Sequence, residues 1–261
     1  MRARSVRCLI ALGIVAVSAV TIPGSAFASA RVGPKPSGSI TVSAAASLTD
    51  AFTRLGDEFE KQYPKASVTF NFGSSSALVT QMQGGAPADV FAAADLTNMD
   101  KLLSTGKITT APTTFARNNL QIAVKPGNPK NVSSLADLEG IGIVSLCGAS
   151  VPCGVYAANV LSRAAVQIPE SNVTRGADAK ATIAAVAQGD ANAAIVYSTD
   201  VKAAGSTVKG VVIPDDQNTI AVYPIAPVAD NSNPKLAKAF VEYVASPKGQ
   251  KTLTRYGFLA P

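Results

Sequence analysis

The chain has 261 residues, of which 47% are hydrophobic and 15% charged, so it can bury a large core and is not disordered. It contains no histidine, which excludes Ser-His-Asp and Cys-His relays as well as zinc or haem sites that need a His ligand. Trp is also absent and the net charge of +6 comes without a basic block, so no nucleic-acid partner is expected.

The N-terminus has the pattern of a secretory signal peptide. Three arginines and no acidic residue lie in residues 1–7, and an apolar or small run follows over 8–22. This run of about 15 residues is shorter than the roughly 20 that span a bilayer. Small-x-small patterns end at Ala28 and Ala30, either of which suits cleavage, and we assign residues 1–28 to the signal peptide. The alternative is an uncleaved N-terminal anchor.

Cleavage would change the charge and the location of the protein. The three arginines leave with the signal peptide, so the mature chain has a net charge of +3 and its basic character says little about partners. Residues 29–38 contain two Pro and two Gly and are expected to form a flexible leader. We expect an exported protein, in the periplasm or at the cell surface.

Strands and helices are predicted to alternate along the rest of the chain. The expected strands are 39–44, 67–72, 88–92, 120–124, 141–146, 193–197 and 208–213, and a long apolar stretch covers 221–229. The expected helices cover 48–59, 76–84, 99–103, 135–138, a segment after Pro152, 179–188 and a last helix that begins near Pro234. Ser47, with Asp50 three residues on, is expected to cap the first helix. This order predicts a parallel, doubly wound α/β architecture.

Two cysteines, Cys147 and Cys153, remain in the mature chain. In an oxidising compartment we expect them to form a disulfide, which would stabilise the fold by roughly 2 kcal/mol because it closes a short loop. The alternatives are a reactive thiol or a metal clip, although two Cys without His make a poor transition-metal site.

Four predicted helix starts share small or hydroxyl residues at the ends of strands. They lie at 44–49, 73–78, 151–154 and 177–180. Ligands of open α/β sheets bind where strands end and helices begin, and free backbone N–H groups there attract anions. Such neutral donors suit a fully deprotonated oxyanion. The alternative is that each Ser is an ordinary N-cap and each Gly an ordinary turn. Asp89 and Asp95 are expected to be structural, because carboxylates would repel an anion.

The combination of motifs is more specific than any one junction. The longest are Ile40–Thr49, Gly73–Leu78, Gly85–Asp95, Val151–Gly154, Ala194–Asp200 and Arg255–Phe258. From Ser39 to the C-terminus the chain resembles the extracytoplasmic molybdate-binding proteins of molybdate ABC transporters. The resemblance implies a type II periplasmic-binding-protein fold, with two doubly wound lobes joined by two crossover strands and a ligand cleft between them. Residues 39–117 plus 224–261 would form the first lobe, and 118–223 the second.

The resemblance also implies which groups bind the oxyanion. In the first lobe these are the hydroxyls and amides at Ser47 and Ser75. In the second they are the backbone N–H groups of Cys153 and Ala179 and the phenol of Tyr197, although a Tyr that ends an apolar strand is commonly a core residue. The family commonly has Ala where this chain has Cys153, but a backbone donor survives that change. A disulfide to Cys147 would brace the loop that presents it.

The function implied is capture of molybdate, and of tungstate as well, for a membrane permease, by a monomer without a cofactor or a side-chain metal ligand. The nearest alternative is a protein of the same fold for sulfate, phosphate or an organic anion. A secreted Ser/Lys hydrolase is a distant one: Ser-x-x-Lys occurs three times, at Ser104, Ser206 and Ser232, without Ser-Asp-Asn or Lys-Thr-Gly partners. We therefore expect no enzyme. An adhesion protein would not need a cluster of helix-start donors.

Overall fold

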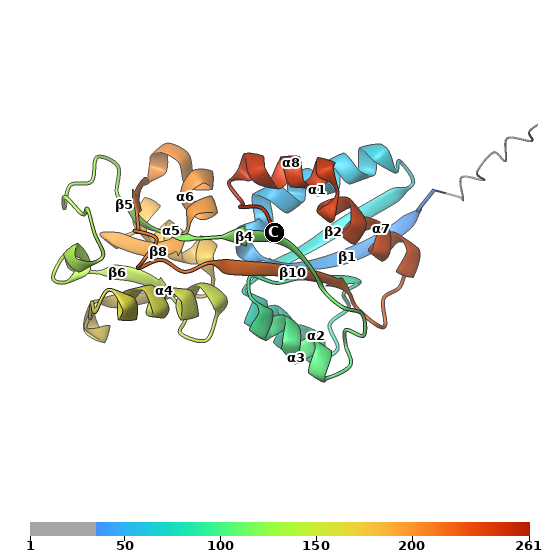
Figure 1. Cartoon of the computed structure of the whole chain (residues 1–261), viewed down its shortest axis with the longest axis horizontal. Coiled ribbons are helices and arrows are strands. Elements are labelled where there is room, and N and C mark those ends of the chain that lie inside the picture. The colour runs from blue at the N-terminus through green and yellow to red at the C-terminus, as the bar shows by residue number, and fades with distance from the viewer. Residues whose placement is uncertain (1–34) are drawn as a thin grey trace, which may run out of the picture. The chain divides into compact units, whose positions relative to one another are not determined.

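The computed structural model of the protein describes residues 35–261 (Figure 1). The predicted signal peptide over 1–28 and most of the predicted leader over 29–38 lie outside the described residues. Within the described part, the strands form two five-stranded sheets, each with helices on both faces, which confirms the predicted α/β class. Among residues 35–261, no helix combines the length and the apolar character that crossing a membrane requires.

The first sheet combines strands from both ends of the described chain. Its order is β2-β1-β3-β10-β4. The bounds are β1 Gly38–Ala45, β2 Ala66–Gly73, β3 Val90–Ala92, β4 Thr113–Asn118 and β10 Ala221–Pro227. β1 runs parallel to β2 and β3, whereas β10 is antiparallel to both of its neighbours. The sheet is therefore mixed, and the strand that returns late in the sequence accounts for the antiparallel pairs.

The second sheet is built from one continuous stretch of chain. Its order is β7-β6-β8-β5-β9. The bounds are β5 Leu120–Val124, β6 Val144–Cys147, β7 Val173–Gly176, β8 Ala193–Tyr197 and β9 Lys209–Val212. β6 is parallel to β7 and β8, and β5 is antiparallel to β8 and β9. As in the first sheet, the strand that arrives from the other sheet brings the antiparallel pairing.

Helices cover both faces of each sheet. On the first sheet, α1 Thr49–Gln62, α7 Pro234–Ala245 and α8 Pro247–Tyr256 pack together on one face, and α2 Ser75–Gln83 and α3 Leu96–Ser104 lie on the other (Figure 1). On the second sheet, α5 Ala179–Ala187 and α6 Ser198–Ala204 pack on one face and α4 Pro152–Arg163 on the other. We call the first sheet with α1–α3, α7 and α8 lobe 1, and the second sheet with α4–α6 lobe 2.

Burial in α1 follows the helical spacing that predicted it. Ala51, Phe52, Leu55 and Phe59 are all buried. The rings of Phe52 and Phe59 pack edge-on against Phe240 of α7, with centroids 6.1 and 5.3 Å apart. An apolar stripe on each helix therefore meets its counterpart on the next, and this aromatic cluster fixes α1 and α7 on the sheet.

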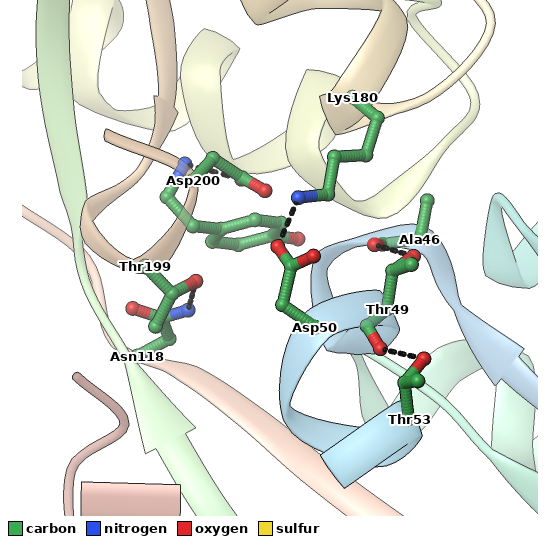
Figure 2. Close-up of polar contacts among 9 residues, drawn as sticks. Ala46, Thr49, Asp50, Thr53, Asn118, Lys180, Thr199 and Asp200 are labelled. Atoms are coloured by element: carbon green, nitrogen blue, oxygen red, sulfur yellow. Dashed lines mark hydrogen bonds and ion pairs between the residues drawn. The ribbon is translucent and has the colours of Figure 1, made fainter. Parts of the chain in front are cut away.

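The predicted cap of the first helix is wrong. Ser47 lies in a short 3-10 helix, Ala46–Leu48, and within the described residues its side chain makes no cap hydrogen bond to α1. Its hydroxyl instead lies 3.0 Å from the phenol oxygen of Tyr223. The Thr49 hydroxyl donates to the Ala46 carbonyl at 2.7 Å and so ties the 3-10 helix to the start of α1 (Figure 2).

Some elements differ from the sequence prediction. The strand predicted over 88–92 begins only at Val90, and the one over 141–146 begins at Val144. The sequence predicts no helix after the one that begins near Pro234, but α8 follows it directly. The break has a local cause: Pro247 cannot continue the preceding helix, and the Ser246 hydroxyl accepts from the Gly249 N–H at 3.3 Å to start a new one.

The chain passes between the lobes along two segments that lie side by side. β4 continues through Asn119 into β5, and the returning chain enters β10 at Ala221, which pairs with Asn118. The Asn218 side chain bonds both the N–H and the carbonyl of Leu120, each at 3.0 Å. The two connections are therefore fastened to each other where they leave lobe 2.

Candidate functional site

A small pocket lies between the two lobes. All five residues predicted as ligand contacts line it, namely Ser47, Ser75, Cys153, Ala179 and Tyr197. Its empty volume is only about 220 Å³, even with the open solvent at its mouth included. The space therefore suits a small ion better than a sugar or a peptide.

Lobe 1 contributes three buried serines, Ser47, Ser74 and Ser75, which follow the ends of two parallel strands. Ser47 follows β1 and Ser75 is the first residue of α2, which follows β2. Ser74, and not Ser75, caps α2 by accepting from the Ala77 N–H at 3.4 Å. The Ser75 oxygen accepts from the Ala94 N–H at 3.0 Å. The Ala94 N–H thus occupies one lone pair of the Ser75 oxygen, and the Ser75 hydroxyl still has its own hydrogen to donate.

Lobe 2 contributes two helix starts. Cys153 is the second residue of α4 and Ala179 the first of α5, so their backbone N–H groups have no acceptor within their own helices. The positive end of each helix dipole adds to the attraction for an anion. Asp178 caps α5, with one carboxylate oxygen accepting from the Ala181 N–H at 2.9 Å.

The predicted disulfide between Cys147 and Cys153 is present. It joins the last residue of β6 to the second residue of α4, with Cα atoms 5.8 Å apart. Gly154 follows, and a Cβ at that position would collide with the Gly148 carbonyl. The disulfide and this close approach together hold the loop that presents the Cys153 N–H.

Tyr197 ends β8 with its phenol against the pocket. The hydroxyl is buried and has no hydrogen-bond partner among residues 35–261. Burial, with smaller contributions from Tyr223 and Tyr156, raises the pKa of Tyr197 well above its usual value, so the group stays a neutral donor. A buried donor without a partner is costly unless a ligand supplies one.

The charges near the pocket are arranged around Lys180. Its ammonium lies 2.5 Å from an Asp50 carboxylate oxygen, and this ion pair joins the start of α5 in lobe 2 to the start of α1 in lobe 1 (Figure 2). Asp200 is buried nearby, and its carboxylate accepts from the Tyr197 N–H at 3.3 Å. Burial raises the pKa of Asp200 to about 7, while Lys180 and the Tyr197 N–H pull it down. Partial protonation of Asp200 at neutral pH reduces the negative charge beside the pocket.

The remaining predicted carboxylates have structural contacts. Asp89 accepts from the Thr41 N–H at 2.6 Å and from the Ser232 hydroxyl at 2.8 Å. Asp95 caps α3 by accepting from the Asn98 N–H at 3.0 Å. Across the described residues, no group of three or more His, Cys, Asp or Glu side chains is placed to hold a metal ion.

Sequence reasoning missed three features of this region. Ala94 lines the pocket after β3, and the small-residue run that contains it was the available signal. Tyr223 contacts Ser47 from β10, and the Asp50–Lys180 pair bridges the lobes. The partners in these two contacts are 176 and 130 residues apart in sequence, so no local pattern could join them.

Comparison with known proteins agrees with the fold. The family model described as bacterial extracellular solute-binding protein matches residues 40–259. The molybdate-binding protein ModA of Mycobacterium tuberculosis (strain ATCC 25618 / H37Rv) is 35% identical over 257 residues, which cover 98% of this chain and 96% of the relative.

Two solved structures share the architecture. The periplasmic molybdate-binding protein of Azotobacter vinelandii superposes with a TM-score of 0.77 at 21% identity, covering 85% of this chain and 99% of that one. The sulfate-binding protein SubI of Mycobacterium tuberculosis H37Rv gives a TM-score of 0.75 at 21% identity, covering 84% and 86%. At these identities the likeness bears on the fold alone, which is that of type II periplasmic binding proteins. The family match and the near-full-length relative show that the chain belongs to the bacterial extracellular solute-binding proteins, a non-enzymatic transport family.

Proposed function

We propose that the protein captures molybdate outside the cytoplasm and passes it to the permease of an ABC transporter. The observation that carries this proposal is the convergence of neutral donors from both lobes on one small pocket, which includes the unpartnered phenol of Tyr197. The relatedness to a molybdate-binding protein over nearly the full chain supports molybdate as the anion.

The chemistry of the pocket suits a deprotonated tetrahedral anion. The hydroxyls of Ser47, Ser75 and Tyr197 and the backbone N–H groups of Cys153 and Ala179 would donate to its oxygens. Molybdate and tungstate carry no proton at neutral pH and can accept from every donor. Hydrogen phosphate carries a proton that needs an acceptor. The one carboxylate among the described lining residues, Asp178, is engaged in capping α5.

The two-lobed fold supports a closure mechanism. The anion would first contact donors of one lobe, and hinge motion would then bring up the other lobe to complete the shell. The proposed lobe boundaries are 39–117 plus 224–261 for lobe 1 and 118–223 for lobe 2. The closed monomer would be the form that the permease recognises. The predicted signal peptide over 1–28 would direct the protein out of the cytoplasm.

Calorimetric titration of the mature protein tests this function. Molybdate and tungstate should bind tightly, sulfate weakly and phosphate least. Tighter binding of sulfate than of molybdate would overturn the proposal and favour a sulfate carrier, for which the likeness to SubI supports only the fold. Ser75→Asp should abolish binding because it places a negative charge at a buried pocket residue. Ser76→Asp is the matched control, since Ser76 lies on the same helix but outside the pocket lining.

A further inference from the structure

A chain of buried hydrogen bonds connects the two crossing segments to the pocket. It runs from Asn118, at the end of β4, to the phenol of Tyr223 in β10 and on to the hydroxyl of Ser47. We propose that Tyr223, oriented by Asn118, fixes the Ser47 hydroxyl as a donor to the anion and so makes the site discriminate against protonated oxyanions. This inference rests on the proposed function.

The first step is the orientation of the Asn118 amide. One of its two end atoms lies 3.0 Å from the Asn119 N–H, which can only donate, so that atom is the oxygen. The same oxygen accepts from the Ser198 hydroxyl at 2.9 Å. The other atom is therefore the nitrogen, a donor without lone pairs to offer. It donates to the Thr199 hydroxyl at 2.9 Å, the contact drawn in Figure 2, and to the Tyr223 oxygen at 3.4 Å.

The second step is the direction of the Tyr223 hydrogen. Tyr223 is fully buried, and burial raises the pKa of its phenol above the usual range, so the hydroxyl keeps its hydrogen. Its two hydrogen-bond partners among residues 35–261 are the Asn118 nitrogen and the Ser47 oxygen. The nitrogen cannot accept, so the Tyr223 hydrogen points to Ser47 at 3.0 Å.

The third step concerns Ser47 itself. Its oxygen accepts from Tyr223, so its own hydrogen is free to point elsewhere, and Ser47 lines the pocket. The Ser75 oxygen accepts from the Ala94 N–H in the same way, so its hydrogen is also free to point elsewhere. Ser47 and Ser75 therefore each have one acceptor site occupied by a fixed donor and offer the anion a hydrogen, and the third serine of the lining, Ser74, accepts from the Ala77 N–H at 3.4 Å. Each of these oxygens has one of its two lone pairs occupied, which leaves a protonated oxyanion fewer acceptors for its own hydrogen than free serine hydroxyls would offer.

The Tyr223 ring is held firmly enough for this role. It packs edge-on against Phe115, Tyr197 and Phe258, with centroids 6.2, 5.9 and 5.3 Å apart. Phe258 belongs to the C-terminal motif, in which Gly257 ends α8 at φ 98°, a conformation that favours glycine. Tyr223 is thus a positioning residue that acts through Ser47, and the phenol cannot swing to another partner.

The test compares two anions of the same charge and nearly the same size. At mildly alkaline pH selenate carries no proton, whereas arsenate is mainly the singly protonated dianion. Tyr223→Phe should weaken molybdate binding about fivefold, the equivalent of one ordinary hydrogen bond. It should also lower the ratio of selenate to arsenate affinity about fivefold, because a Ser47 lone pair becomes available. Tyr156→Phe is the matched control, since the Tyr156 ring also packs against Tyr197, at a centroid distance of 6.3 Å, while its hydroxyl is not part of the chain of hydrogen bonds, and it should leave the ratio unchanged.

A double-mutant cycle separates positioning from direct contact. In a Ser47→Ala background, Tyr223→Phe should have no further effect on molybdate binding, because the group through which it acts is gone. If Tyr223→Phe does not fold, Asn118→Asp replaces the amide nitrogen with an acceptor, draws the Tyr223 hydrogen away from Ser47 and should lower the same ratio. A Tyr223→Phe variant that binds molybdate as tightly as wild type and keeps the same ratio of selenate to arsenate affinity would overturn this inference alone. Full additivity in the double-mutant cycle would do the same. A wild type that binds no tetrahedral oxyanion would overturn the proposed function and the inference with it.

Discussion

Tyr197 contributes a single unmet hydrogen bond to the proposed binding site. Its phenol lies against the pocket and has no partner in the part of the chain that the structure describes. Sequence alone favours a core role for a Tyr that ends an apolar strand, and the burial of the ring agrees with that. A core role does not explain the hydroxyl, because Phe would fill a core position equally well.

Tyr197→Phe should therefore change stability and binding in opposite directions. Removing an unpaired buried hydroxyl should raise the free energy of unfolding of the ligand-free protein by about 1 kcal/mol. Molybdate affinity should fall about tenfold, because one donor is lost. Denaturant melts without ligand and calorimetry with molybdate measure the two effects. A variant that is less stable without ligand would mean that the hydroxyl has a partner in the empty protein.

Asp200 should make stability depend on pH in the direction opposite to most carboxylates. Its folded-state pKa is raised to about 7, mainly by burial, against about 4 in an unfolded chain. Between these values the folded protein binds more protons than the unfolded one, so the free energy of unfolding falls as the pH rises. Asp200→Asn should remove this slope, and its stability relative to wild type should increase from about pH 4 to about pH 7.

The pH dependence of Asp200→Asn is measured by denaturant melts at a series of pH values, and Asp137→Asn provides the contrast in the same experiment. Hydrogen bonds from Ser133 and Ser134 lower the pKa of Asp137 to about 2, so its contribution is present above about pH 4 and is lost as the pH falls. The two variants should deviate from wild type over different pH ranges. Parallel stability curves for wild type and Asp200→Asn across pH 4 to 7 would contradict the raised pKa of Asp200.

At the scale of elements, the pocket is a set of loops that begin helices, and the β6–α4 loop is the most constrained of them. The Cys147–Cys153 disulfide should stabilise the protein by about 2 kcal/mol through its effect on the unfolded chain. Replacing both cysteines by Ala should lower the unfolding free energy by that amount and weaken molybdate binding a few-fold, because the Cys153 N–H is held less rigidly.

The binding part of this prediction separates two roles of the disulfide. Calorimetry on the double variant and on wild type measures the affinity, and Cys147→Ala with Cys153→Ala keeps every backbone donor in place. Unchanged affinity together with the expected loss of stability would show that the disulfide stabilises the fold without shaping the site.

Local patterns predicted those elements whose signal is local. The period of α1, the strand β8 and the start of α4 at Pro152 all follow from spacing or from a single residue type. The antiparallel direction of β10 could not be predicted, because an apolar strand has the same appearance in either direction. The cap assigned to Ser47 was wrong because its hydroxyl contacts a residue that is distant in sequence. Tertiary pairing in this case overrides a local preference.

At the scale of the whole molecule, the Asp50–Lys180 pair joins the two lobes across the pocket. Both side chains are partly exposed, at 47% and 35%, so the pair should be worth no more than about 1 kcal/mol. Lys180→Gln or Asp50→Asn should therefore speed molybdate release about two- to fivefold, measured by stopped-flow displacement. Added salt should speed release from wild type more than from either variant.

Lys238→Gln is the matched control for this pair. Lys238 pairs with Glu242 within α7 at 3.8 Å, so its loss breaks an ion pair inside lobe 1 and none between the lobes. Equal release rates for Lys180→Gln and Lys238→Gln would contradict a role for the interlobe pair in holding the lobes together.

The strand order has a consequence for when each lobe can fold. The second sheet uses only residues between Leu120 and Val212, so all of its strands have been made before β10 emerges. The first sheet needs β10 between β3 and β4, and one of its faces needs α7 and α8. We therefore expect lobe 2 to fold first and the N-terminal strands to wait until β10, α7 and α8 have been made. A protein built in this way keeps β1 to β4 uncommitted until a strand that follows the whole of lobe 2 arrives to pair with them.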